Sequence, residues 1–270
     1  MNYYADSSNN YRLLQVLNLL GFIVMVVVNY LSNALPINGL TAEEVSDKFY
    51  NLFVPAGFTF AIWGVIYLLL GIFVIYQALS IFTGNRRELS YVRKLSYLFF
   101  TSCILNSIWL FAWHYLRIGL ALIIMVLLLL NLILIYRRLR NHEVKNERLG
   151  TLVRGAFSIY IGWITIATIA NVSAWLVSIE WGGFGVSEVF WMIVVLIVAT
   201  AIVLRFMFKY WDWLYGLVAV WAFFGIISAR LQDDPVQTLV VVMTAICLAV
   251  VAAGIGRLIL WKKKSIFSSS

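Results

Sequence analysis

Long runs of apolar residues, separated by short polar stretches, dominate the sequence between residues 13 and 260. A helix that crosses the hydrocarbon core of a bilayer needs about 20 predominantly apolar residues, because that core is roughly 30 Å thick. Eight runs meet or approach this length, and each predicts a transmembrane helix. These runs are Leu13–Leu35, Ala56–Phe82, Leu95–Tyr115, Ile118–Tyr136, Gly155–Val177, Val189–Phe208, Trp211–Ala229 and Val236–Leu260. Arg205, Lys209 and Asp212 leave only a very tight connection between the sixth run and the seventh.

The basic residues give an independent check of this count, because Lys and Arg beside transmembrane helices are retained on the cytoplasmic side. With the N-terminus inside, all but three of the 20 Lys and Arg residues fall in inner segments. The exceptions are Lys48, Arg117 and Arg230, in the outer loops. Removing or adding a helix would scramble this alternation. We therefore predict an all-α, polytopic membrane bundle of eight helices with both termini in the cytoplasm.

The composition agrees with a membrane protein. The chain is 63% hydrophobic and 12% charged, whereas soluble domains carry about 25% charged residues. Its net charge of +8 comes from basic residues that lie beside apolar runs. The partner that they imply is the anionic surface of a bilayer and not a nucleic acid. A cleaved signal peptide is the alternative for the first run, although that run is longer than a usual signal sequence.

The longest outer loop, residues 36–54, is acidic and contains a predicted short helix. Thr41 and Glu44 have the spacing of a capping box, in which each residue satisfies a backbone N–H of the first turn. One side of this helix would carry Val45, Phe49 and Leu52. Such a helix would lie over the membrane or over the mouth of a pocket, and an ordinary surface loop is the alternative.

The predicted spans carry no Asp, Glu, Lys or Arg at their centres. Proton-coupled transporters, voltage sensors and ion pores need such groups at depth, so these classes are disfavoured, while passage of a neutral solute stays open. His114, near the outer end of the third span, is either an axial haem ligand or an interfacial histidine. No metal-ligand cluster, phosphate loop or catalytic triad is recognisable, which favours binding over catalysis.

Aromatic and amide side chains recur at helical spacing in three spans. The stripes are Phe60, Trp63, Tyr67 and Gly71; Ser102, Asn106, Trp109 and Trp113; and Tyr160, Trp163, Ala167 and Asn171. A buried Asn needs a hydrogen-bond partner in hydrocarbon, so Asn106 and Asn171 should face the bundle interior. Converging stripes would form a flat-walled cavity suited to a large planar lipophilic ligand. Plain helix packing and interfacial aromatic belts are the alternatives.

These segments resemble, in their order, the tryptophan-rich sensory protein / translocator protein (TspO/MBR) family. The matching motifs are Pro55-Ala56-Gly57-Phe58-Thr59-Phe60, Trp63-x-x-x-Tyr67, Leu105-Asn106-x-x-Trp109, Tyr160-x-x-Trp163 and Ala167-Thr168-x-x-Asn171. The chain departs from the family where a double proline is reduced to Pro55-Ala56 and where Ile159 replaces a proline. Phe53 also lies near the place of an expected tryptophan. These departures affect the geometry of the outer loop.

The resemblance implies a five-helix core, residues 11–177, that binds porphyrins, other tetrapyrroles or sterol-like lipids beneath the outer loop. The residues that it implies for the ligand site are Trp63, Tyr67, Asn106, Trp109, Tyr160, Trp163, Ala167 and Asn171. The bound porphyrin or haem would be a ligand, and no cofactor is required. A transporter or facilitator of a small lipophilic or neutral solute is the alternative, and an enzyme that modifies bound pigment is a third.

Three further helices, residues 178–262, and a polar cytoplasmic tail, residues 263–270, follow the core. Pairs of small residues in the last helix allow close contact between helices. The pairs are Ala249 with Ala253, and Ala252 with Gly256. They predict either a seam that joins this helix to the core or the face of a homodimer.

Overall fold

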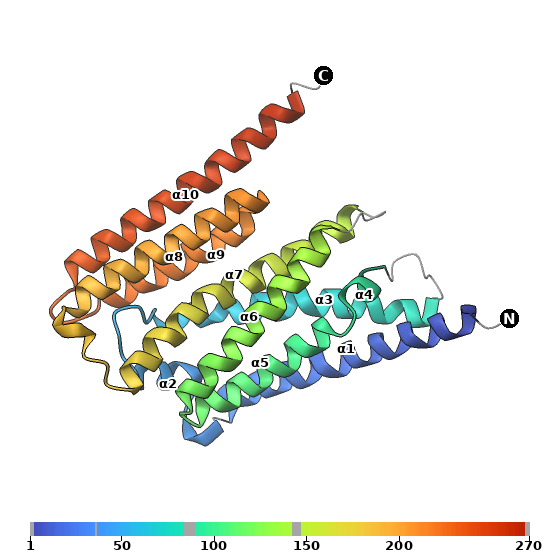
Figure 1. The fold of residues 1–270 in the computed structure, drawn as a ribbon, viewed down its shortest axis with the longest axis horizontal. Helices are drawn as coiled ribbons and strands as arrows, with labels where there is room; N and C mark the ends of the chain where they lie inside the picture. The colour runs from blue at the N-terminus through green and yellow to red at the C-terminus, as the bar shows by residue number, and fades with distance from the viewer. Residues whose placement is uncertain (1–2, 36, 84–89, 142–146, 268–270) are drawn as a thin grey trace. The chain divides into compact units, whose positions relative to one another are not determined.

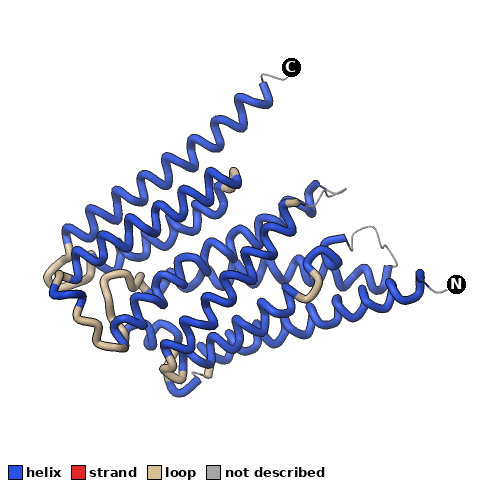
Figure 2. Tube along the Cα trace, in the orientation of Figure 1, coloured by secondary structure: helices blue, strands red, loops and turns tan. Residues whose placement is uncertain are grey.

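The computed structural model describes residues 3–35, 37–83, 90–141 and 147–267, and in these ranges all regular elements are helices (Figures 1 and 2). The α-helices are α1 (Tyr3–Ala34), α2 (Ala42–Lys48), α3 (Ile62–Thr83), α4 (Ser90–Leu95), α5 (Leu98–His114), α6 (Ile118–Arg140), α7 (Glu147–Ser178), α8 (Glu188–Tyr210), α9 (Trp213–Arg230) and α10 (Thr238–Phe267). Short 3₁₀ helices are η1 (Ile37–Gly39), η2 (Gly57–Ala61) and η4 (Gly183–Gly185).

Seven of the described helices are long and apolar enough to cross a membrane, and α5 is a shorter apolar helix of 17 residues. At 1.5 Å per residue α5 is about 26 Å long, close to the thickness of the hydrocarbon core. These eight helices correspond one for one to the predicted spans, and the predicted all-α class is confirmed. The cytoplasmic placement of both termini stays a prediction.

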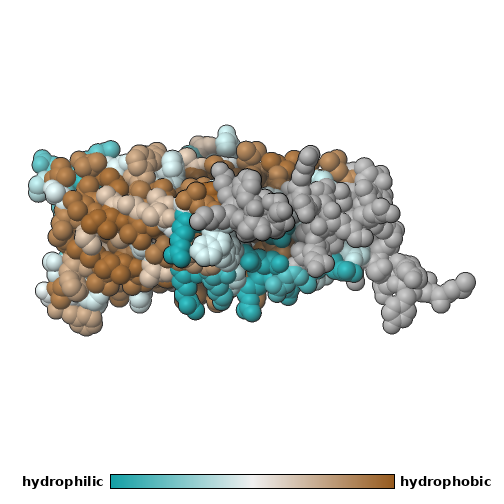
Figure 3. All heavy atoms as spheres, turned by 90° about the horizontal axis from the view of Figure 1, so that it is seen from above, coloured by the Kyte–Doolittle hydropathy of each residue, from teal (hydrophilic) through white to brown (hydrophobic). Residues whose placement is uncertain are grey.

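Apolar side chains on the outside of the helices are consistent with contact to lipid. Helix α10 exposes Leu239, Val242, Ile246, Val250, Ile259, Leu260 and Trp261. Figure 3 shows hydrophobic residues covering much of the drawn face that is not grey. Soluble monomers rarely expose contiguous apolar patches larger than a few hundred Å².

Two breaks between helices depend on single residues in the left-handed backbone region. Ser96 (φ 52°) separates the short helix α4 from α5, so the third predicted span begins after this turn. Trp211 (φ 54°) ends α8, and Asp212 then starts α9 by accepting a hydrogen bond from the backbone N–H of Tyr215 at 3.3 Å. The prediction of two separate helices at this tight joint is confirmed.

The chain forms two compact units, and α7 contributes to both. The first unit comprises Met1–Val45 and Trp63–Ile161, and the second comprises Ser46–Ile62 and Gly162–Ser270. The predicted boundary between a core at 11–177 and additional helices at 178–262 stays a prediction.

In the first unit, α5 packs against α1 and α6. Gly21 allows the close approach of α1 to α5, since a Cβ atom at this position would lie 2.8 Å from a ring carbon of Phe100. Buried amides join α1 to α3: Gln15 Nε2 donates to the Gln77 carbonyl oxygen at 2.5 Å, and Asn18 Nδ2 donates to Gln77 Oε1 at 3.1 Å. This contact keeps the polar groups of the buried amides away from lipid, where they would lack hydrogen-bond partners.

In the second unit, α8, α9 and α10 pack side by side (Figure 1). Met207 of α8 lies between two glycines, because a Cβ atom at Gly216 or at Gly254 would come within 2.6 Å of its side chain. The glycines in this contact are not the small residues of the predicted pairs. Ala249, Ala252 and Ala253 are exposed, and nothing lies within 4 Å of a Cβ built on Gly256. A homodimer face there stays a prediction.

Candidate functional site

Aromatic rings from three helices meet in the first unit. Trp63 of α3 stacks on Tyr67 of the same helix, with centroids 5.5 Å apart and an interplanar angle of 18°. The Trp63 ring lies 6.2 Å from the Trp109 ring on α5 and 6.2 Å from the Tyr160 ring on α7. Trp113 extends the set along α5, with its ring 6.0 Å from that of Trp109. Trp63 is thus in contact with three other rings. We call these four residues the ring cluster: Trp63, Tyr67, Trp109 and Tyr160.

The ring cluster is buried at one side and partly exposed at the other. Tyr160 and Trp109 are 0% and 5% exposed, whereas Trp63 and Tyr67 have intermediate exposure. The hydroxyl oxygen of Tyr67 is inaccessible to solvent and makes no hydrogen bond to a described residue. Leaving a buried polar group unsatisfied costs about 1–3 kcal/mol. This hydroxyl is therefore a suitable partner for a polar group on a ligand.

A pair of buried carboxamides, one on α5 and one on α1, includes a residue close in sequence to the α5 part of the ring cluster. Asn106, one turn before Trp109, is fully buried and accepts a hydrogen bond from Asn29 Nδ2 of α1 at 2.9 Å. Asn29 also donates to the Met25 carbonyl oxygen at 2.8 Å. The expectation that Asn106 faces the interior is confirmed. Asn29 was not predicted; the available signal was an amide within an apolar helix, where it needs a partner.

The other three predicted site residues belong to the second unit, on the later part of α7. Trp163 is 4% exposed and packs edge-on against Phe60 of η2, with centroids 6.3 Å apart. Ala167 has intermediate exposure. Asn171 is 4% exposed, and its Nδ2 donates to the Ala167 carbonyl oxygen at 2.9 Å. The structure thus brings five of the eight predicted residues into one unit and places Trp163, Ala167 and Asn171 in the other.

The segment that leads into α3 is fastened to α9 within the second unit. We call this segment, Ser46–Ile62, the strap. The backbone N–H of Ala56 donates to the Gly225 carbonyl oxygen at 3.0 Å. Trp221 Nε1 donates to the Thr59 carbonyl oxygen at 2.9 Å. Ala56 replaces the second proline of the family motif, and a proline could not donate this hydrogen bond.

Close contact between the strap and α9 requires a glycine. A Cβ atom at Gly225 would lie 2.0 Å from Thr59 Oγ1, so even alanine could not fit without movement. Phe58 flanks this contact, with its ring 5.4 Å from that of Trp221 and 5.8 Å from that of Phe224. The sequence offered no sign that α9 would hold the entry to α3.

The predicted capping box in the outer loop is confirmed. Thr41 N–H donates to Glu44 Oε2 at 2.7 Å, and Glu44 N–H donates to Thr41 Oγ1 at 3.2 Å, at the start of α2. These hydrogen bonds lower the pKa of the Glu44 carboxyl group. Trp113 Nε1 donates to the Ala42 carbonyl oxygen at 3.2 Å, which joins α2 to the end of α5. Because α2 ends at Lys48, the predicted helical side with Phe49 and Leu52 is wrong; only Val45 of that set lies on the helix, where it is buried.

His114 closes α5 and is fully buried. Its Nδ1 lies 2.8 Å from the Leu110 carbonyl oxygen, and its own carbonyl oxygen accepts a hydrogen bond from Asn38 Nδ2 at 3.0 Å. Among the described residues, no group of three or more His, Cys, Asp or Glu side chains could hold a metal ion. The role of His114 as a haem ligand stays a hypothesis.

A family model matches most of the chain. The family model described as TSPO-like protein matches residues 15–257, a range that covers all or most of each of the seven membrane-crossing candidates and of the shorter helix α5, and thus extends over the three helices beyond residue 178. No curated protein and no solved structure matches the chain. The match covers most of the sequence, and the chain is a multi-pass integral membrane protein that belongs to the TSPO-like protein family.

Proposed function

We propose that the chain is a membrane binding or sensory protein for a planar lipophilic ligand such as a porphyrin, another tetrapyrrole or a sterol-like lipid. The observation that carries this proposal is the ring cluster, in which Trp63 contacts rings from its own helix and from two others. Stacked and edge-on aromatic faces favour flat apolar ligands, and a few convergent polar groups fix their orientation. The Tyr67 hydroxyl and the Asn106 carboxamide supply such polar groups.

The three residues on the later part of α7 have distinct roles in this proposal. Trp163 would add an indole face whose position is set by its contact with Phe60. Ala167 would leave room beside that face, because its side chain is small. Asn171 is anchored to its own helix, because its Nδ2 donates to the Ala167 carbonyl oxygen, and its carboxamide would supply a polar group for the ligand.

Titration of the purified protein in nanodiscs with protoporphyrin tests the proposal. The readout is the shift of the porphyrin's own absorption band, since removing tryptophans would by itself alter a fluorescence-quenching signal. The Trp109→Ala, Trp163→Ala double variant should raise the dissociation constant at least about tenfold, equivalent to about 1.4 kcal/mol. Trp261→Ala, which removes an exposed indole at the end of α10, is the control and should leave the constant unchanged. An unchanged titration with the double variant would contradict the proposal.

A transporter of a neutral solute is the second candidate, and one feature of the first unit favours it. The buried amides Gln15, Asn18 and Gln77 form a second polar group, ten residues along α3 from Tyr67. Three buried rings, Phe73, Phe99 and Phe157, pack edge-on with centroids 5.3–5.9 Å apart in the same unit. Polar groups interrupted by an apolar constriction are a feature of gated pathways. Uptake by proteoliposomes that protein-free vesicles do not show, accelerated by Phe99→Ala, would favour this candidate.

A further inference from the structure

Arg230, at the end of α9, is buried although it carries a permanent charge. Its side chain is 3% exposed, whereas the sequence placed it in a short outer loop. A buried arginine is retained only where opposite charge and hydrogen bonds replace its hydration. The partners of Arg230 therefore show which parts of the chain its charge holds together.

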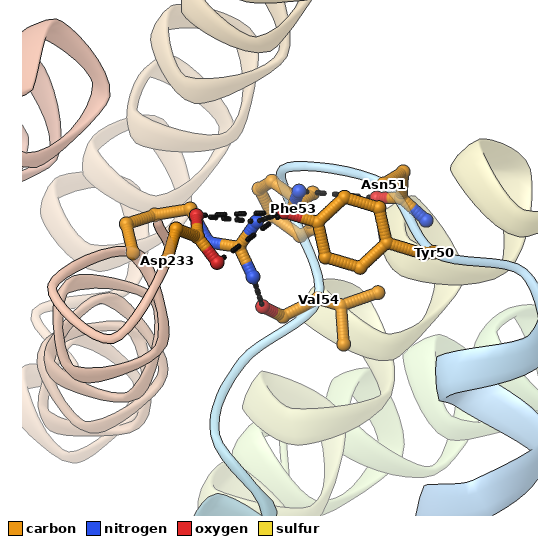
Figure 4. A network of polar contacts seen from close by, with 6 residues as sticks. Tyr50, Asn51, Phe53, Val54 and Asp233 are labelled. Carbon is orange, nitrogen blue, oxygen red and sulfur yellow. Dashed lines mark hydrogen bonds and ion pairs between the residues drawn. The ribbon is translucent and has the colours of Figure 1, made fainter. Parts of the chain in front are cut away.

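Two of these partners belong to the strap and one follows α9 (Figure 4). Arg230 Nη1 donates to the hydroxyl oxygen of Tyr50 and forms an ion pair with Asp233 Oδ2 at 3.2 Å. Arg230 Nη2 donates to the Val54 carbonyl oxygen at 3.5 Å. The Tyr50 hydroxyl in turn lies 3.4 Å from both carboxylate oxygens of Asp233, and the guanidinium lies 4.9 Å from the centroid of the Tyr50 ring.

The planar guanidinium suits this arrangement, because it can donate in several directions at once and also stack on an aromatic ring. Asp233 supplies the opposite charge that a buried guanidinium needs, and Tyr50 and Val54 supply two hydrogen-bond acceptors. Lysine could keep the charge but could not reproduce the fork. We call this set of four residues the latch: Tyr50, Val54, Arg230 and Asp233.

The strap is connected to the ring cluster through the chain itself. Helix η2 ends at Ala61 and α3 begins at Ile62, so no flexible linker separates the strap from Trp63. The backbone N–H of Ile62 continues the helical hydrogen bonding of η2. Trp63, the first residue of the ring cluster, directly follows the last residue of the strap.

Resting on the proposed function, we propose that Arg230 is a positioning residue for the ligand site. By binding Tyr50 and Val54, Arg230 would fix the strap on α9. It would thereby fix the start of α3, the helix that carries Trp63 and Tyr67. The last three helices would then be part of the binding machinery through α9, without contacting the ligand. Release of the latch would make the strap mobile and let ligand leave faster.

Hydrogen exchange of the full-length protein in nanodiscs measures local opening of the strap, and it does so in the absence of ligand. In the native chain, Phe53 N–H donates to Asn51 Oδ1 at 3.1 Å and Val54 N–H donates to the Asn51 carbonyl oxygen at 3.0 Å. Arg230→Gln should speed exchange of these amides at least about tenfold, since local opening controls exchange. Arg257→Gln, which removes an exposed arginine from α10 in the same unit, is the matched control and should leave them unchanged.

Stopped-flow measurement of protoporphyrin release supplies the second arm. Arg230→Gln should raise the dissociation rate at least about fivefold with a smaller change in the association rate, as is usual for changes at a binding site. Arg230→Lys should restore part of the native rate, because it keeps the charge opposite Asp233. Tyr50→Phe removes one oxygen from a half-exposed side chain and should give an intermediate rate with an unaltered unfolding midpoint. This variant keeps the inference testable if Arg230→Gln does not fold.

The two arms separate the failure of this inference from the failure of the proposed function. Unchanged exchange of the strap amides in both Arg230→Gln and Tyr50→Phe would overturn the latch. Faster exchange with native release rates would show that the latch does not position the ligand site, although the ring cluster would still bind. If the native protein binds no protoporphyrin, the proposed function fails and the positioning role fails with it. Hydrogen exchange of the strap amides would still show whether Arg230 holds the strap.

Discussion

Gly225→Ala is the substitution whose effect the structure specifies most closely. In an ordinary helix, replacing glycine by alanine stabilises by up to about 1 kcal/mol, because glycine loses more backbone entropy on folding. Here the new Cβ atom would lie 2.0 Å from Thr59 Oγ1, 2.9 Å from its Cγ2 and 3.0 Å from its Cβ. The strap must therefore move away from α9 by about 1 Å or more, and crowding of this kind costs about 1–3 kcal/mol.

The displacement also strains two hydrogen bonds across the same contact. Ala56 N–H donates to the carbonyl oxygen of Gly225 itself, and Trp221 Nε1 donates to that of Thr59. Each is worth about 1 kcal/mol net. After the gain in helix propensity is subtracted, Gly225→Ala should destabilise the protein by about 2 kcal/mol.

Unfolding by titration with sodium dodecyl sulfate, followed by circular dichroism, measures this change. Gly64→Ala is the control, since nothing lies within 4 Å of a Cβ at that position, and it should be neutral or stabilising. Thr59→Ala removes the two nearest atoms and should rescue Gly225→Ala, with a coupling energy of at least about 1 kcal/mol in a double-mutant cycle. Equal stability of Gly225→Ala and the native protein, without coupling to Thr59, would refute the reasoning.

Three further predictions concern other parts of the chain. Asp212→Ala removes the N-cap of α9 and should lower stability by about 1 kcal/mol in the same unfolding titration, whereas Asp212→Asn should retain most of it. Asn29→Leu leaves the buried Asn106 carboxamide without this donor and should cost about 1–3 kcal/mol, with the thermal midpoint falling accordingly. The lowered pKa of Glu44 means that its contribution to the start of α2 is fully present above its ordinary value of 4.5 and is lost as the pH falls through the lower folded value. The protection factor of the Thr41 amide, which is the exchange rate of an unstructured peptide at the same pH divided by that of the protein, should therefore fall only in that acid range, and Glu44→Gln should abolish this fall.

The number of helices was predictable because a bilayer imposes one length on every crossing segment. The tight joint between α8 and α9 was also foreseeable from Lys209 and Asp212, which interrupt the apolar pattern. The left-handed residues that make the turns, Ser96 and Trp211, carried no signal, because neither is a glycine or an asparagine. The third span consequently starts three residues later than its apolar run.

The ring cluster was partly predictable for a similar reason. Helical spacing shows which residues share a side of one helix, and a buried amide such as Asn106 shows which side faces inward. Spacing does not say which helices are neighbours, so the contact of Phe60 with Trp163 and the pairing of Asn29 with Asn106 required the structure. The reduction of a double proline to Pro55-Ala56 was expected to affect the geometry of the outer loop, and the N–H that it provides at Ala56 joins the strap to α9.

The central claim is that the ring cluster binds a flat ligand, and ¹⁹F NMR of protein labelled with 5-fluorotryptophan tests it most directly. The chain has 11 tryptophans, and single Trp→Phe variants would assign the resonances of Trp63, Trp109, Trp211 and Trp261. On addition of protoporphyrin, the large ring current of the pigment should shift the Trp63 and Trp109 resonances and saturate at one equivalent. The exposed Trp211 and Trp261 should shift weakly and without saturation. Larger shifts at Trp211 and Trp261, with Trp63 and Trp109 unmoved, would place the pigment in the surrounding lipid and contradict the account.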